Sequence, residues 1–173
     1  MKIKKIGAFA GKFLPPHLGH ISEIENSAKL CDELIVVVAD NTQNSMNLCE
    51  RAGLPFISAK MRVDWLKKHF KNNKKIKVIY MCEDDLKAFP DGMKEWSERF
   101  KEITKHRVNM KFADETYRTL NEKYFPECEF VCFDRKKVDI SATMIRENPK
   151  QYLNFIIPEA QVFFKEIIDK KEI

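Results

Sequence analysis

The residues best suited to chemistry lie near the start of the chain, in the stretch GAFAGKFLPPHLGH over residues 7–20. This stretch holds Lys12 and two histidines, His17 and His20, three positions apart. Their side chains donate hydrogen bonds and can carry positive charge. Such groups bind phosphate or, in the case of histidine, a metal ion.

A Walker phosphate loop is excluded by both spacing and residue type. That loop requires GxxxxGK followed by Ser or Thr, because the hydroxyl binds magnesium. Here only three residues separate Gly7 from Gly11, and Phe13 follows Lys12. The dinucleotide pattern GxGxxG is also absent.

A zinc site on His17 and His20 is disfavoured as well. Catalytic zinc takes three protein ligands, and the glutamate of an HExxH motif is missing. The five cysteines form no CxxC pair, so neither a zinc ribbon nor a disulfide framework is indicated. We expect no protein-bound metal, and we expect free, mostly buried thiols in a reducing cytoplasm, including Cys128 and Cys132.

The physical alternative is a phosphate-binding loop that follows a strand. Gly11 lets the backbone turn out of the strand, and Gly19 clears space at the start of the next helix. The amides and dipole at a helix N-terminus favour anions. A second candidate of this kind is ISATMIR, where Ser141 is a helix N-cap, Thr143 lies in the first turn and Arg146 lies one turn later.

The remaining sequence alternates strand-like and helix-like segments. We expect strands over 5–11, 32–40, 76–82, 107–112 and 128–134, and helices over 19–30, 58–70, 92–104, 115–125, 141–149 and 158–171, with a polar loop over 41–47. Alternation of this kind predicts an α/β, Rossmann-like, doubly wound parallel sheet. The 173 residues fit a single domain over 1–173, in which 150–173 is a C-terminal helical segment packed on the rest.

The bulk composition excludes several classes. No apolar run approaches the length of a membrane span, and no signal peptide is recognisable. The net charge of +5 is modest. The basic stretch over 67–77 is interpreted as the solvated end of a helix rather than as a nucleic-acid patch, so no DNA or RNA partner is expected.

The two motifs resemble the paired HxGH and ISTxxR signatures of the nucleotidyltransferase superfamily. The segments MRVDWL, FPDGMKEWSE and RENPKQYLNFIIPEA extend the resemblance over nearly the whole chain. Within the superfamily the sequence is most similar to the nicotinamide-nucleotide adenylyltransferase domain of the NadR type. Two departures are noted: neither a DNA-binding segment nor a kinase segment is expected, and Met93 stands where relatives tend to have tryptophan.

The resemblance implies an enzyme that joins ATP and nicotinamide mononucleotide to give NAD and pyrophosphate, with Mg²⁺ bound together with ATP. The catalytic candidates are His17, His20, Lys12 and Arg146. The candidates for ATP binding are Gly11, Phe13, Gly19, Ser141, Thr143 and Arg146. The candidates for acceptor binding are Trp96, Arg62 and Lys12, of which Trp96 would stack on the pyridine ring.

Several alternatives stay open at this point. The acceptor could be nicotinate mononucleotide, phosphopantetheine or a phosphorylated alcohol. The protein could also be a catalytically weak sensor of NAD or ATP. An RNA-binding relative is a third alternative, suggested by the basic stretch over 67–77 and disfavoured because no anticodon-type segment is recognised. A homo-oligomer is neither required nor excluded. For Trp96 a place in the hydrophobic core is as good an interpretation as stacking on a ligand, and Trp65 is expected in the core. The acidic cluster Glu83 to Asp85 follows a strand, and lining the site and forming a solvated loop are equally good interpretations of it.

Overall fold

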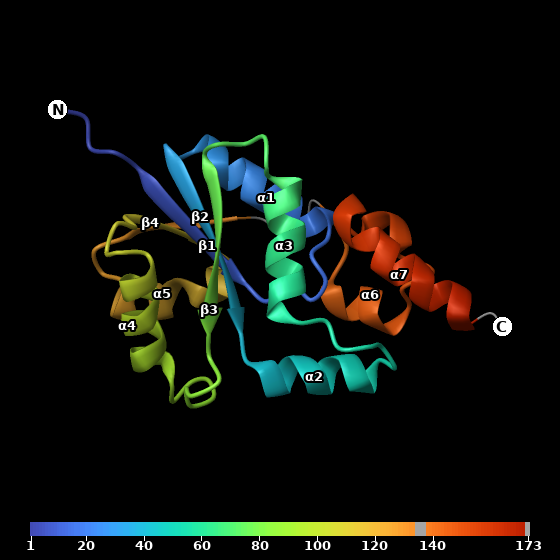
Figure 1. Ribbon diagram of the computed structural model, residues 1–173. Helices are drawn as coiled ribbons and strands as arrows, with labels where there is room; N and C mark the ends of the chain where they lie inside the picture. Colours follow the sequence, from blue (N-terminus) through green and yellow to red (C-terminus); the bar gives the residue numbers. More distant parts are fainter. Residues whose placement is uncertain (134–137, 172–173) are drawn as a thin grey trace.

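A five-stranded parallel sheet forms the centre of the protein (Figure 1), whose computed structural model describes residues 1–133 and 138–171. The strand order is β3-β2-β1-β4-β5, and every neighbouring pair is parallel. The strands are β1 (Ile6–Gly11), β2 (Glu33–Asp40), β3 (Ile76–Cys82), β4 (Met110–Ala113) and β5 (Glu129–Cys132). The chain thus moves outward from β1 in one direction and then in the other.

This reversal of direction creates a switch point between β1 and β4. In open parallel sheets, ligands bind beyond the carboxyl ends of the strands at such a point. The loop that follows β1 therefore starts at the position where a ligand site is expected.

The sheet has a hydrophobic core on each face, because consecutive residues of a strand point to opposite sides. All eight residues of β2 are buried. Val36 and Val38 belong to one core, and Ile35 and Val37 belong to the other. Burial on both faces explains why the sequence of β2 is a continuous apolar run rather than an alternating one.

Helices cover both faces of the sheet (Figure 1). Residues of α1, α3, α6 and α7 contribute to the first core, while α4 and the end of α5 contribute Phe100 and Phe125 to the second. The helices are α1 (Leu18–Lys29), α2 (Thr42–Arg51), α3 (Ala59–His69), α4 (Met93–Ile103), α5 (Arg118–Tyr124), α6 (Ala142–Glu147) and α7 (Pro158–Lys171), with short 3-10 turns η1 (Glu115–Tyr117) and η3 (Leu153–Phe155). The prediction of a doubly wound parallel sheet is confirmed.

The polar loop predicted over 41–47 is wrong, because these residues begin α2. Asn41 caps this helix by accepting a hydrogen bond from the Asn44 backbone amide. Only Ser45 and Cys49 of α2 are buried, so the helix lacks the apolar periodicity by which a helix is recognised in sequence.

Smaller differences concern the last two strands. The strand expected over 107–112 is Met110–Ala113, and that expected over 128–134 is Glu129–Cys132, with Asp134 outside the described residues. Cys132 is exposed rather than buried, because β5 is an edge strand. All five cysteines are free.

The C-terminal helix α7 packs on the sheet domain; of the segment expected over 150–173, residues 172–173 lie outside the described residues. Phe164 of α7 is fully buried, and Phe163 contacts Trp65 of α3 at 5.8 Å between ring centroids. Trp65 packs against the first core, as predicted. Among the described residues, no helix is long and apolar enough to cross a membrane.

Candidate active site

The loop between β1 and α1 carries Lys12 and His17 at the carboxyl edge of the sheet, and His20 follows in the first turn of α1. The loop is held from the C-terminal side of the chain. Ile157 donates a backbone hydrogen bond to the Pro16 carbonyl at 3.4 Å, and Ile156 forms an antiparallel bridge with His17. The segment before α7 thus fixes the position of the histidine motif.

His17 and His20 form a reciprocal cap at the start of α1. The Nδ1 of His17 accepts the backbone amides of Gly19, at 3.1 Å, and of His20, at 3.3 Å. In return, His20 Nδ1 accepts the His17 amide at 3.2 Å. The two rings stack with centroids 3.6 Å apart. The helix amides that were expected to meet a phosphate directly are therefore bonded to the His17 imidazole.

This arrangement determines which nitrogen of each ring can donate. Because Nδ1 accepts a backbone N–H, the neutral ring of His17 or His20 carries its proton on Nε2. Both imidazoles are then hydrogen-bond donors through Nε2, in a fixed orientation. Gly19 makes the arrangement possible, since a Cβ there would lie 2.9 Å from Cε1 of His17.

Phe13 supports His20 from the loop side. Its ring contacts the His20 ring edge-on at 4.9 Å, and its side chain is only 1% exposed. Its backbone has a φ of 54°, in the left-handed region that residues other than glycine rarely adopt. Phe13 was predicted to bind ATP; its side chain lies in the first core, in contact with the His20 ring.

Arg146 brings the second motif onto the first. Ser141 caps α6 by accepting the Met144 amide, as the sequence predicts. The guanidinium of Arg146 donates through Nη1 to the Leu14 carbonyl at 2.7 Å and through Nη2 to Thr143 Oγ1 at 3.2 Å. Burial lowers the pKa of Arg146 from its ordinary value. The tertiary structure thus joins two motifs that lie more than a hundred residues apart.

Lys12 lies between the loop and the end of β2. Its side chain is 31% exposed, and Nζ lies 4.0 Å from Oδ1 of Asp40. Burial lowers the pKa of Lys12, while the nearby charges of Asp40 and Glu83 raise it. A partly buried ammonium at this edge of the sheet can bind an anion through charge and hydrogen bonds.

Arg62 differs from its expected role as a ligand for the acceptor phosphate. Its side chain is fully buried, and its Nη1 donates to the Lys12 carbonyl at 2.7 Å. Nη2 lies 2.9 Å from Asp40 Oδ1. The guanidinium therefore contacts protein groups and offers no surface to a ligand in this structure.

Trp96 contacts the second core, and its role toward a ligand stays a prediction. It stacks on Phe100 at 5.3 Å and packs against the second core. Its Nε1 also donates a 2.6 Å hydrogen bond to Glu83 Oε1, and the Glu83 backbone amide donates to the Asp40 carbonyl at 2.8 Å. Trp96 is thereby tied to the same sheet edge as Lys12, and it stays partly exposed.

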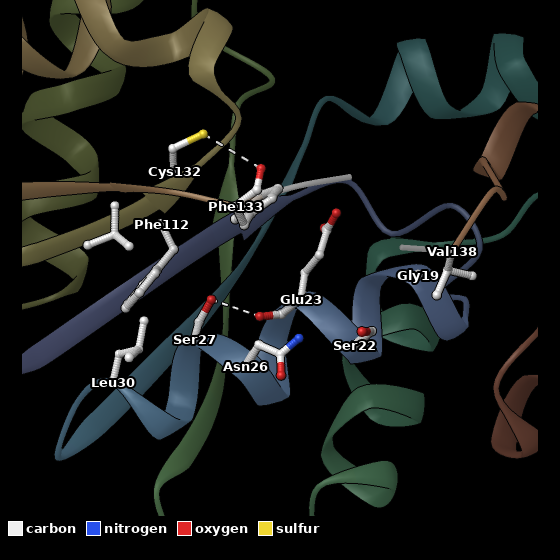
Figure 2. A pocket seen from close by; sticks show the side chains of 11 residues that line it. Gly19, Ser22, Glu23, Asn26, Ser27, Leu30, Phe112, Cys132, Phe133 and Val138 are labelled. Atoms are coloured by element: carbon white, nitrogen blue, oxygen red, sulfur yellow. Dashed lines mark hydrogen bonds between the residues drawn. The ribbon is translucent and has the colours of Figure 1, made fainter. Parts of the chain in front are cut away.

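A cavity of about 220 Å³ lies along α1, between this helix and the ends of β4 and β5 (Figure 2). In the figure, Gly19 and Val138 lie together at one end and Leu30 at the other. Polar side chains of α1 face apolar groups of the two strands across it, among them Ser22, Asn26, Val131 and Phe133. It adjoins the histidine motif and is large enough for part of a nucleotide.

Two residues of the site escaped the sequence analysis. Asp40 is the last residue of β2, and Ser45 donates a hydrogen bond to its Oδ1. The signal for Asp40 was available, because a carboxylate that ends a buried parallel strand lies at the ligand-binding edge. In the described part of the chain, no group of three or more His, Cys, Asp or Glu side chains could hold a metal ion.

Comparisons with known proteins agree with this fold. The cytidylyltransferase-like family model matches residues 8–148. The trifunctional NAD biosynthesis/regulator proteins NadR of Salmonella typhimurium and Escherichia coli are 29% identical over 169 residues. Those matches cover 93% of this chain and 41% of each NadR protein, so the chain spans about two fifths of their length.

A curated protein with a different acceptor and a solved structure are also similar to this chain. A phosphopantetheine adenylyltransferase of Dictyoglomus turgidum is 29% identical over 153 residues, covering 82% of each protein. The crystal structure of a NadR protein in complex with NAD and AMP-PNP is 30% identical, with a TM-score of 0.71 over 91% of this chain and 46% of that one. The resemblance indicated by the two motifs is confirmed, and the chain belongs to the cytidylyltransferase-like family of the nucleotidyltransferase superfamily.

Proposed function

We propose that the protein is a nicotinamide-nucleotide adenylyltransferase, which joins ATP and nicotinamide mononucleotide to give NAD and pyrophosphate. The observation that carries the proposal is the hydrogen bond from Arg146 to the Leu14 carbonyl. This bond holds the second motif against the β1–α1 loop, so that Arg146 lies at the same edge of the sheet as Lys12, His17 and His20. A site for a polyphosphate and a second phosphate requires such a group of donors. NadR relatives, one of them in complex with NAD and AMP-PNP, support this acceptor.

In the proposed reaction a 5′-phosphate oxygen of the mononucleotide attacks the α-phosphorus of ATP in line. A new P–O bond forms, the bond from the α-phosphorus to the α,β-bridging oxygen breaks, and pyrophosphate leaves with that electron pair. No protein nucleophile is needed. The protein aligns two anions and stabilises the charge of the transition state.

The roles of the residues are assigned from the hydrogen-bond donors of their side chains. His17 and His20 donate through Nε2 to the phosphates of ATP, and His20 is assigned to the transition state. Lys12 binds a phosphate shared with the acceptor. Ser141, Thr143 and Arg146 hold the departing pyrophosphate, with Arg146 also fixing the loop through Leu14. Gly11 and Gly19 let the backbone approach the nucleotide, and the cavity beside α1 receives its adenosine part.

Magnesium is assigned to the substrate, as the complex with ATP. The donors at the site are cationic or neutral N–H groups, which suit phosphate oxygens rather than a metal ion. Mg²⁺ usually keeps several waters and binds through substrate phosphates, and when bound it neutralises part of their charge.

The choice of a pyridine acceptor rests on Trp96 and Glu83. The indole gives an aromatic surface at the sheet edge, and a flat cationic ring is attracted to such a surface. The carboxylate of Glu83, bonded to Trp96 Nε1 at 2.6 Å, adds attraction for the cationic ring. It also repels the additional carboxylate of nicotinate mononucleotide, and this favours the amide form.

The deciding experiment is pyrophosphate release from ATP, measured in parallel with nicotinamide mononucleotide, nicotinate mononucleotide and phosphopantetheine. The proposal expects the highest kcat/KM with nicotinamide mononucleotide. Preference for phosphopantetheine would overturn the pyridine assignment, and preference for the acid form would overturn the role of Glu83 alone. Binding of ATP without turnover of any acceptor would indicate a nucleotide sensor.

A further inference from the structure

A buried ion pair lies behind the candidate site. Arg62 of α3 is fully buried, Asp40 at the end of β2 is 1% exposed, and Nη2 lies 2.9 Å from Oδ1. Removal of two charges from water is costly, and a buried pair often adds no net stability. Its position beside Lys12 indicates a role in the chemistry of the site.

Arg62 connects α3 to the backbone of the loop. Its Nε donates to the Ser58 carbonyl at 3.2 Å, in the residue that caps α3. Its Nη1 donates to the Lys12 carbonyl at 2.7 Å. One guanidinium thus fixes the distance between the start of α3 and the main chain of Lys12.

Asp40 faces the side chain of the same lysine. Its Oδ1 accepts a hydrogen bond from Ser45 and lies 4.0 Å from Lys12 Nζ. Its Oδ2 is buried and accepts no hydrogen bond from any described residue. Oδ2 of Asp40 can therefore accept a hydrogen bond from the nearby ammonium group of Lys12.

From this geometry we infer that Asp40 and Arg62 are positioning residues that act through Lys12. Arg62 holds the main chain of Lys12, and the carboxylate of Asp40 orients its ammonium group. Neither residue needs to touch a substrate. The inference rests on the proposed function only in that it places Lys12 at a phosphate.

The charges that surround Lys12 predict the direction in which its pKa changes when Asp40 is replaced. Asp40 and Glu83 raise the pKa of Lys12, whereas Arg62 and Arg146 lower it together with burial, which is the largest effect. The imidazoles of His17, at the end of the loop, and of His20, in the first turn of α1, are changed in none of the variants below. Loss of the Asp40 charge must therefore lower the pKa of Lys12.

The test follows Lys12 directly, in the protein without substrates. The lysines are converted to ¹³C-dimethyl-lysine, and the Lys12 resonance, assigned by its loss in Lys12→Arg, is followed against pH by NMR. Asp40→Asn should move its midpoint down by about one unit, since an opposite charge at 4–6 Å shifts a pKa by roughly one to three units.

The control is Glu33→Gln, at the other end of the same strand. Glu33 is also a buried carboxylate, and it pairs with Lys4, Lys77 and Arg107. This variant removes a buried charge without affecting Lys12, so the midpoint should stay at the wild-type pH. An unchanged midpoint in folded Asp40→Asn, or an equal shift in Glu33→Gln, would overturn the inference.

A second variant covers the case in which Asp40→Asn does not fold. The double variant Asp40→Asn/Arg62→Met leaves no unpaired buried charge, which is the main cost of breaking such a pair. The effect of Asp40 on Lys12 exceeds that of Arg62, so the midpoint should still fall. A midpoint that stays or rises would contradict the inference.

Turnover gives an independent readout. In Asp40→Asn the alkaline limb of the kcat/KM profile should move down by the same amount as the NMR midpoint, while Glu33→Gln keeps the wild-type profile. Arg62→Lys retains the charge but not the planar fork, and should lose at least about ten-fold in kcat because Lys12 is no longer held. If the wild-type protein turns over no acceptor, the proposed function fails, and the NMR titration still decides the inference.

Discussion

The rings of His17 and His20 stack at 3.6 Å, and each Nδ1 accepts a backbone amide of the motif. The pair is therefore both a helix cap and a source of two oriented Nε2 donors. A substitution in it affects local geometry as well as phosphate binding.

Replacement of His20 by alanine is expected to lower kcat by roughly two to four orders of magnitude, the range for loss of one transition-state donor or proton-transfer group. Steady-state kinetics with saturating substrates measures the effect. The matched control is His106→Asn. His106 is exposed and has a φ of 52°, which asparagine tolerates, so this variant should retain wild-type turnover. Near-normal turnover in His20→Ala would contradict the assignment.

Replacement of Trp96 by alanine is expected to raise the KM for nicotinamide mononucleotide about ten-fold or more, if stacking contributes 1–3 kcal/mol. The KM for ATP should change much less. Trp65→Ala is the control, because Trp65 packs on Phe163 at the opposite face and should affect stability alone. Equal changes in both KM values for Trp96→Ala would show that this tryptophan is structural.

Replacement of Glu83 by glutamine tests the preference for the amide. The variant keeps an acceptor for Trp96 Nε1 and removes the negative charge. The ratio of kcat/KM for nicotinamide over nicotinate mononucleotide should fall about three- to ten-fold, the size of a screened charge–charge interaction. Asp85→Asn is the control, since Asp85 is exposed and pairs with Arg99. A ratio that responds equally to both variants would reflect the general charge of the loop.

The low pKa of Glu33 predicts that the folded protein loses stability in acid. Burial raises the pKa of this carboxyl, but hydrogen bonds from Arg107, Lys77 and Lys4 outweigh burial and bring it to about 2. Because the folded pKa lies below the unfolded one, the stabilisation is complete above about pH 4.5 and is lost as the pH falls toward 2. Urea unfolding at a series of pH values should show Glu33→Gln less stable at pH 7 by up to roughly 3 kcal/mol. The difference should vanish near pH 2.

A second rise of stability with pH is expected from Lys111, in the neutral to alkaline range. It is buried against Phe100 and Phe125, with Nζ 3.7 and 4.3 Å from their ring centroids, and burial lowers its pKa to about 7. Between pH 7 and 10.5 the unfolded chain holds a proton that the folded protein has lost, so stability rises with pH. Lys111→Met should therefore be more stable at pH 7 by at least about 1 kcal/mol, a gain that fades above pH 10.

The control for Lys111 is Lys101→Met. Lys101 also lies over Phe125, at 5.2 Å, but it is partly exposed and pairs with Glu127. Its replacement should give no gain in the free energy of unfolding at pH 7. A loss of stability in Lys111→Met would mean that the contacts of the ammonium with the aromatic rings outweigh the cost of its burial.

Periodicity and composition were enough to predict the sheet and most of its helices. The continuous apolar run of β2 and the Ser141 cap of α6 are local features, because each depends on residues within a few positions. The helix over Thr42–Arg51 was missed, since its cap on Asn41 resembles a polar turn and its buried face is narrow. The two motifs, recognised from residue types and spacing, supplied the residues of the candidate site, whose roles stay predictions.

Only the tertiary structure decided what each of these residues contacts. Arg62 was expected at the acceptor phosphate, but packing of α3 on the sheet buries it against Asp40 and the Lys12 carbonyl. Trp96 acquires its place at the sheet edge through Glu83. Sequence spacing describes neighbours along a helix or strand. Contacts between elements depend on how those elements pack together. Because an unpaired buried charge is costly, Arg62 pairs with the carboxylate and carbonyl that this packing places beside it.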